Sequence, residues 1–343
     1  MTNAHFILSK KTTINQVKIL EKLGLKVSYS YKTNHEVGNI LQDKCPEIEF
    51  SLHALEEVAM IKNKSKISFF TQAESKEELE SLIKNGVKNF VIDNEIDLKK
   101  ILEIIEKTKT NIDLSLRMKF QEHSIGTGKY FVYGMPSYKI NEIIKEIKNN
   151  PLIKKLGIHL HRKSQNTSEW EISEEIEDSL TKETLERINF INLGGGLPVK
   201  YRSYTAEIQN YIFKKLTETI NFLKKKNIET IIEPGRFIAA PSIKLITEII
   251  QIYDNNIILN TTIYNCALDT IIGEHKMLIE EEQKIGENYL IKGNSPTRDD
   301  IFRYNVQLKN PKIGDKITFL NAGAYNYTTD FFGYKKLKTI ILN

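Results

Sequence analysis

The strongest constraint on the fold is an alternation of short apolar strands with amphipathic helices. Eight β-branched or aromatic runs are separated by segments with helical periodicity. In the helical segment 94–109, for example, we expect Ile96, Leu98 and Ile101, together with Ile104 and Ile105, to form one apolar stripe. The eight predicted strands are 27–32, 47–52, 66–71, 89–94, 113–120, 155–161, 188–194 and 229–235.

Eight strand–helix units predict an α/β fold, a (β/α)8 TIM-like barrel over residues 10–240. An open doubly wound sheet has the same alternation and is the alternative, which the count of eight disfavours. Beyond residue 240 the runs, among them 261–268, are strand-like with short turns. They predict a C-terminal β-rich domain, a β-barrel or β-sandwich, over 241–343, into which residues 1–9 can pair. The Glu-rich stretch 168–187 is predicted to be an exposed helix.

Charge and composition narrow the class of protein. The net charge of +5 is spread along alternating Lys and Glu, so we expect no nucleic-acid groove. No apolar run reaches the roughly 18–20 residues of a membrane span, and the start lacks the pattern of a secretory signal. The two cysteines, Cys45 and Cys266, suit a reducing cytoplasm and give no sign of a metal site.

Unusual residues gather where the predicted barrel strands end, which is where barrels of this class carry their sites. Lys32 closes the first strand, Arg117 lies on the fifth, and His159 and His161 end the sixth. We expect His159 to be a core residue, whereas Arg117 is either a cofactor-side residue or a charge partner inside the barrel. The glycines Gly194, Gly195 and Gly196 follow the seventh strand, and "EPGR" (233–236) follows the eighth.

These residues together suggest one cofactor. Three glycines after the seventh strand can expose backbone N–H groups to a phosphate, and Arg236 can add a guanidinium fork. A lysine at the same mouth, Lys32, can form a Schiff base with the aldehyde of pyridoxal 5'-phosphate. Glu233 is placed to keep the pyridine nitrogen protonated, and the flat imidazole of His161 can stack on the ring.

The same stretches resemble the fold-type III pyridoxal-phosphate decarboxylases, which act on ornithine, arginine, lysine, diaminopimelate and related amino acids. The resemblance covers nearly the whole chain through "YSYKTN", "GIHLHRKSQ", "LGGGLP", "EPGR" and "NAGAYNYTTDFFGY", in that order. It implies a homodimer with the active site at the subunit interface, and it implies Ser164 and Tyr325 near the phosphate. The residues expected on the cofactor are Lys32, Arg117, His161, Ser164, Gly194, Gly195, Gly196, Glu233, Gly235, Arg236 and Tyr325, with Lys32, His161 and Glu233 catalytic.

The chain also departs from that family. Arg298, in "GNSPTRDDIFRY", stands where the family has a cysteine linked to proton donation, so the donor is open. Asp299 or Asp300 is expected to bind a substrate amine from the partner subunit. Arg298 and Glu274 are further candidate substrate contacts, Glu274 within "YNCALDTIIGEHKM", which replaces the family's Arg-Pro-x-x-Tyr pattern.

The sequence therefore predicts a cytoplasmic decarboxylase that uses pyridoxal phosphate on a basic or diamino amino acid. Its substrate class would be ornithine, lysine, arginine or a carboxylated polyamine, which places it in polyamine biosynthesis. Two alternatives stay open: a racemase of the same barrel class, and a non-catalytic relative that binds the cofactor and regulates a partner.

Overall fold

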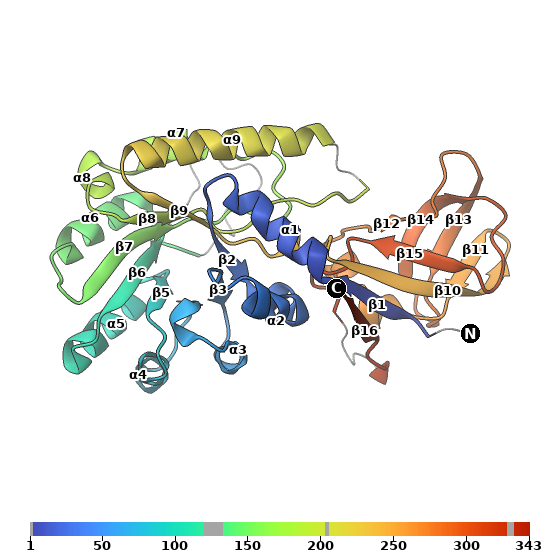
Figure 1. Ribbon diagram of the computed structural model, residues 1–343, viewed down its shortest axis with the longest axis horizontal. Coiled ribbons are helices and arrows are strands. Elements are labelled where there is room, and N and C mark those ends of the chain that lie inside the picture. The colour runs from blue at the N-terminus through green and yellow to red at the C-terminus, as the bar shows by residue number, and fades with distance from the viewer. Residues whose placement is uncertain (1–2, 120–132, 203–205, 328–332) are drawn as a thin grey trace.

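Eight parallel strands close into a barrel, as the sequence predicts, because β2 pairs with β3 on one side and with β9 on the other. The computed structural model describes residues 3–119, 133–202, 206–327 and 333–343. Residue 120 of the predicted fifth strand and residues 328–332 of the C-terminal motif lie outside these ranges. Figure 1 shows the barrel on the left and the β-rich part on the right. The barrel strands are β2 (Lys26–Ser30), β3 (Glu49–Leu52), β4 (Ile67–Phe70), β5 (Asn89–Ile92), β6 (Ile112–Arg117), β7 (Ile153–His159), β8 (Phe190–Asn192) and β9 (Glu229–Ile232).

Helices cover the outside of the barrel, and their ends follow capping rules. Ser75 and Glu78 form a capping box at the start of α4. The prediction that Ile96 belongs to the apolar stripe of α5 is wrong, because Ile96 is 72% exposed. At about 100° per residue it lies nearly opposite Leu98 and Ile105 on α5. The helices of this part are α1 (Lys10–Glu21), α2 (His35–Lys44), α3 (Leu55–Met60), α4 (Lys76–Lys84), α5 (Glu95–Thr108), α6 (Ser137–Ile147), α7 (Ile172–Ser179), α8 (Lys182–Leu185), α9 (Ala206–Lys225) and α10 (Arg236–Ala239), with 3-10 turns η1 (Tyr31–Thr33) and η2 (Lys64–Lys66).

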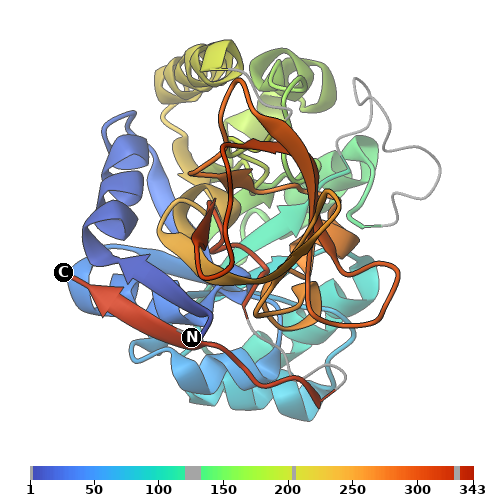
Figure 2. The same ribbon diagram turned by 90° about the vertical axis from the view of Figure 1, so that its right-hand side faces the viewer.

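The β-rich part is one sheet in which distant segments of the chain meet. Its main path runs β12-β15-β10-β11-β13-β14. β1 pairs antiparallel with β10 and parallel with β16, so the predicted pairing of residues 6–9 into this sheet is confirmed. Figure 2 shows β1 and β16 side by side. The strands are β1 (His5–Ser9), β10 (Ile243–Tyr253), β11 (Asn256–Leu259), β12 (Leu278–Ile279), β13 (Glu287–Lys292), β14 (Ile301–Leu308), β15 (Lys316–Leu320) and β16 (Lys338–Leu342).

Two predicted elements differ in the structure. The stretch 261–268 is not a strand: Thr262 caps the short helix α11 (Ile263–Cys266), and α12 (Asp269–Ile272) follows it. The stretch 168–187 is not one exposed helix but contains α7 and α8. Glu169 and Glu175 are buried there because both carboxylates face the buried guanidinium of Arg162, which needs a countercharge inside the protein.

The barrel register sets up the candidate site. Arg117 at the end of β6 pairs with His159 at the end of β7, and His159 pairs with Asn192 at the end of β8. Three polar side chains therefore stand in adjacent positions at the C-terminal mouth of the barrel. The predicted domain division at residue 240 stays a prediction. Among the described residues, no helix combines the length and the apolar character needed to cross a membrane.

Candidate active site

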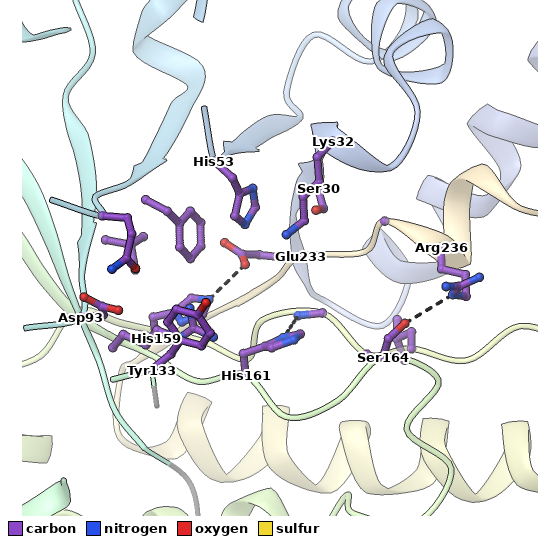
Figure 3. Close-up of a pocket in the computed structure, with 18 of the residues that line it drawn as sticks. Ser30, Lys32, His53, Asp93, Tyr133, His159, His161, Ser164, Glu233 and Arg236 are labelled. Atoms are coloured by element: carbon purple, nitrogen blue, oxygen red, sulfur yellow. Dashed lines mark hydrogen bonds and ion pairs between the residues drawn. The ribbon is translucent and has the colours of Figure 1, made fainter. Parts of the chain in front are cut away.

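A cavity of about 610 Å³ lies at the C-terminal mouth of the barrel and collects most of the predicted site residues. Figure 3 shows Glu233 near its centre, with Lys32 and His53 on one side and His159 and His161 on the other. Arg236 and Ser164 lie at one end, and Asp93 lies at the other. Of the residues expected on the cofactor, those lining the cavity are Lys32, Arg117, His161, Ser164, Gly195, Gly196, Glu233, Gly235, Arg236 and Tyr325.

Glu233 is held by three donors that come from three different strands. Its Oε1 accepts from Ser51 Oγ at 2.7 Å and from Asn192 Nδ2 at 2.8 Å, and its Oε2 lies 3.0 Å from His159 Nε2. Burial alone raises the pKa of a carboxyl, but His159 and Ser51 more than offset it and lower the pKa of Glu233 to about 2. A carboxylate offers about four acceptor positions. Because of its low pKa, Glu233 is charged. Three of its acceptor positions are occupied, so one is left for a donor in the cavity.

His159 is more than the core residue that the sequence predicts. Its ring is 1% exposed, and it lines the cavity between Glu233 and the edge of Phe70, whose centroid is 5.0 Å away. Burial lowers the pKa of His159, so the neutral ring donates its Nε2 proton to Glu233. Its Nδ1 is buried and has no hydrogen-bond partner among the described residues.

Lys32 enters the cavity from the turn that follows β2. The strand ends at Ser30, η1 covers Tyr31–Thr33, and the Asn34 side chain then caps α2 through the Val37 N–H. Burial lowers the pKa of Lys32, while the charges of Glu233 and Glu57 oppose the shift. A larger share of the amine is therefore unprotonated and nucleophilic than at an ordinary lysine.

The glycine loop after β8 packs tightly against the end of β7. A Cβ on Gly194, which has φ +66°, would lie 2.2 Å from the Leu160 carbonyl, so only glycine fits. Gly194 N–H donates to Asn192 Oδ1 at 2.9 Å, and Gly195 N–H donates to His161 Nδ1 at 3.2 Å. Among the described residues, only the N–H of Gly196 is left without a protein acceptor within this triplet. The loop thus offers a ligand fewer amides than its three glycines suggest.

The bond from Gly195 also fixes the state of His161. Burial and the nearby charge of Arg117 lower the pKa of His161 to about 3, so its ring is neutral. Since Nδ1 accepts from Gly195, the ring proton sits on Nε2. A neutral, flat imidazole beside Glu233 can stack on an aromatic ligand.

The guanidinium of Arg236 closes the opposite end of the cavity. Both Nη atoms bind the carboxylate of Asp269, Nη2 to Oδ1 at 3.0 Å, and Nη1 also donates to Tyr201 Oη at 3.0 Å. The fork that the sequence predicts for a phosphate is therefore already engaged by Asp269. The Nε–H donates to Ser164 Oγ at 3.4 Å, and this edge of the guanidinium faces the cavity that Ser164 lines.

None of the four predicted substrate contacts lines the cavity of this chain. Glu274 is not part of the lining. Arg298 and Asp299 project from the β13–β14 connection with side chains 97% and 75% exposed. Asp300 is fully buried and accepts the N–H groups of Ile263 and Ser295, so its carboxylate has a structural role.

Sequence reasoning missed several residues of the site. His53, Phe70, Asp93 and Tyr133 all line the cavity. The first three lie at or just past the ends of β3, β4 and β5, so the strand-end rule that found Lys32 also points to them. Asp269 has no such signal, because it reaches Arg236 from the β-rich part.

The family is decided by a match over most of the barrel. Residues 12–240 match the model of the pyridoxal-dependent decarboxylase family, pyridoxal binding domain. The chain belongs to this family. A pyridoxal-dependent decarboxylase needs a lysine amine, a carboxylate for the ring nitrogen and a cradle for the phosphate. Lys32, the free position on Glu233 and the glycine loop fit that group, as does the Ser164–Arg236 end of the cavity.

Individual members of the family are distant relatives of this chain. A carboxynorspermidine/carboxyspermidine decarboxylase of Campylobacter jejuni is 27% identical over 176 residues, covering 46% of this chain and 44% of the relative. The chain thus spans less than half the length of that relative. Antizyme inhibitor 2 of Xenopus laevis is 22% identical, covering 93% of this chain and 71% of the relative.

Among solved structures, the lysine/ornithine decarboxylase of Vibrio vulnificus with putrescine superposes with a TM-score of 0.81. It is 20% identical and covers 99% of this chain and 94% of that structure. At this identity the likeness shows the fold: a TIM-like barrel followed by a β-rich domain.

Proposed function

We propose that this protein catalyses the pyridoxal-phosphate-dependent decarboxylation of a basic or diamino amino acid. One observation carries the proposal: the lysine amine with a lowered pKa and the three-donor carboxylate of Glu233 share one cavity. When bound, pyridoxal phosphate supplies a carbonyl carbon that links to an amine and a ring that accepts an electron pair.

Each cavity residue then has a task. Lys32 would provide the amine that holds the cofactor. Glu233 accepts the ring N–H in its free position, and its low pKa keeps the proton on the ring nitrogen rather than on the carboxylate. The His161 ring covers one face. Ser164, Gly196 and Arg236 bind the phosphate, and Tyr325 lies beside Arg236 with its ring centroid 5.2 Å from the guanidinium carbon.

The substrate class rests on charge and on the relatives. Asp93 lines the cavity on the side away from Arg236, where a second ammonium group of a substrate can reach it (Figure 3). The Campylobacter relative is a carboxynorspermidine/carboxyspermidine decarboxylase. We therefore favour ornithine, lysine, arginine or a carboxylated polyamine, and a place in polyamine synthesis.

We also propose that the protein works in the cytoplasm as a homodimer. Its thiols Cys45 and Cys266 are both free, which suits a reducing compartment. The exposed side chains of Arg298 and Asp299 are available to enter the cavity of a second copy. The residue that donates the proton in place of the family cysteine would then also depend on how the two copies meet.

The deciding experiment combines trapping with a substrate panel. Borohydride reduction in the presence of pyridoxal phosphate should attach the cofactor to the peptide that contains Lys32, as read by mass spectrometry. Release of CO₂ is then measured with ornithine, lysine, arginine, diaminopimelate and carboxynorspermidine. We expect CO₂ from one of them, and loss of both signals in Lys32→Ala. Lys100→Arg, at an ion-paired lysine of α5, is the matched control and should keep both.

A second candidate function follows from the likeness to antizyme inhibitor 2 over 93% of the chain and from Arg298 at the cysteine position. In that case the chain binds a partner protein and does not decarboxylate. Cofactor attachment to Lys32 with no CO₂ from any substrate of the panel would favour this role over the enzyme.

A further inference from the structure

Arg236 is enclosed by residues from both parts of the molecule. Arg236 starts α10 at the barrel mouth, whereas its carboxylate partner Asp269 starts α12 in the β-rich part. Both side chains are 6% exposed. The guanidinium also lies against two tyrosine rings, with centroids 5.7 Å away for Tyr201 and 5.2 Å away for Tyr325. This cation is therefore enclosed by protein, and its Nε edge lies against Ser164 of the cavity lining.

The position of Asp269 is itself fixed by its neighbours. Its backbone N–H donates to Asn326 Oδ1 at 3.0 Å, and its carbonyl accepts from Gly273 N–H at 3.0 Å. A Cβ on Gly273 would lie 2.8 Å from Asp269 Oδ1, so the turn after α12 brings the backbone close to this carboxylate. The β-rich part thus presents the carboxylate to Arg236 in a single geometry.

The ion pair decides which donor of Arg236 faces the cavity. Nη1 donates to Asp269 and to Tyr201, Nη2 donates to Asp269, and the Nε–H donates to Ser164 Oγ, which lines the cavity (Figure 3). A long arginine side chain loses rotamer freedom when it binds a ligand, and a side chain that is already held loses less. Asp269 does not line the cavity itself, whereas its ion-pair partner Arg236 does.

We propose that Asp269 is a positioning residue for the phosphate end of the site, holding Arg236 so that its Nε edge, beside Ser164, can bind the phosphate of the cofactor. This inference rests on the proposed use of pyridoxal phosphate. It makes retention of the cofactor by the barrel depend on a carboxylate of the β-rich part that does not touch the cofactor.

Two ligands that differ only in the phosphate test this directly. Dissociation constants for pyridoxal phosphate and for pyridoxal are measured by equilibrium dialysis on the wild type and on Asp269→Asn. Since both ligands can link to Lys32, that contribution is common to both. We expect Asp269→Asn to weaken pyridoxal phosphate about tenfold and to change pyridoxal by less than about twofold. Equal weakening of both ligands, or tighter binding of pyridoxal phosphate, would overturn the proposal.

Two further variants keep the test interpretable. Tyr201→Phe keeps the ring but removes the hydroxyl that accepts from Nη1, and it should produce a smaller loss that is again selective for pyridoxal phosphate. Glu282→Gln is the matched control, because Glu282 holds the buried Arg303 in a second two-oxygen ion pair of the β-rich part, away from the cavity. It should leave both constants unchanged. If the wild type binds neither ligand, the proposed function fails; if it binds both and Asp269→Asn shows no selectivity, only this inference fails.

Discussion

The two ends of the cavity are built in different ways. At the Glu233 end, all three hydrogen-bond donors to the carboxylate come from barrel strands and are neutral: Ser51, Asn192 and His159. At the Arg236 end, the cation is neutralised by Asp269 of the β-rich part. The first end is fixed by the register of β3, β7 and β8, and the second by how the two parts pack together. If the protein binds pyridoxal phosphate as proposed, the ring nitrogen would be recognised by barrel residues alone, whereas the phosphate would depend on both parts.

The largest expected effect concerns the charge on Glu233. Its pKa in the folded protein is about 2, below the ordinary value of 4.5. The carboxylate therefore stabilises the fold fully above pH 4.5 by on the order of 3 kcal/mol. This contribution is lost as the pH falls through the folded pKa. Urea unfolding of wild type and Glu233→Gln should show a difference in the free energy of unfolding that narrows by about 1 kcal/mol between pH 6.5 and 3.5.

A difference that stays constant over this pH range would contradict the description of Glu233 as a carboxylate whose pKa is lowered by its barrel neighbours. The free energy of unfolding of Asp269→Asn, measured in the same urea assay, gives the corresponding value for the other end of the cavity.

A medium effect on ligand affinity is expected from substitution of His159. The substitution should weaken binding of the pyridine ring and leave binding of the phosphate unchanged. His159→Leu removes one donor to a charged carboxylate, a loss worth about tenfold in affinity. Because pyridoxal and pyridoxal phosphate share the ring nitrogen, both should bind about equally more weakly, unlike in Asp269→Asn. His159→Gln can still donate and should stay close to wild type in equilibrium dialysis. If His159→Leu weakened only the phosphate-bearing ligand, the separation of the two ends would be wrong.

The smallest effect should come from Tyr325→Phe at the phosphate end. The ring beside Arg236 remains, and only the hydroxyl contact with Thr33 Oγ1, 3.3 Å long, is lost. Tyr325 is 38% exposed, so water replaces much of that contact. We expect less than about threefold weaker binding of pyridoxal phosphate and no change for pyridoxal. A loss as large as that of Asp269→Asn would mean that Tyr325, and not the ion pair, dominates this end.

The parts of the site that the sequence could predict follow from strand ends. Lys32, His161 and Glu233 lie within two residues of the ends of barrel strands, and a closed barrel brings such positions together without further information. The count of eight strand–helix units favoured the barrel, and the strand-like residues 6–9 before the first helix were expected to pair into the β-rich part, as they do.

What the sequence could not show depends on contacts between distant segments. The partner of Arg236 lies 33 residues along the chain, beyond β10 and β11. Nothing local to Asp269 indicates that contact. His159 was expected to be a core residue because a β-strand pattern indicates only that a side chain is buried. The pattern does not show whether that buried side chain pairs with a carboxylate such as Glu233. Thr262 is β-branched, which favours a strand, although its hydroxyl caps α11.

The pairing of β1 with both β10 and β16 has a consequence for the order of events during synthesis. β1 leaves the ribosome long before either partner, and its edge alongside Lys338–Leu342 can be covered only after those residues appear. The barrel strands, which lie between β1 and β10 in the chain, can close earlier, since domains fold largely as units as they emerge. A newly made chain would thus have a formed Glu233 end while Arg236 still awaits Asp269. Translation order would make cofactor capture a late step of maturation.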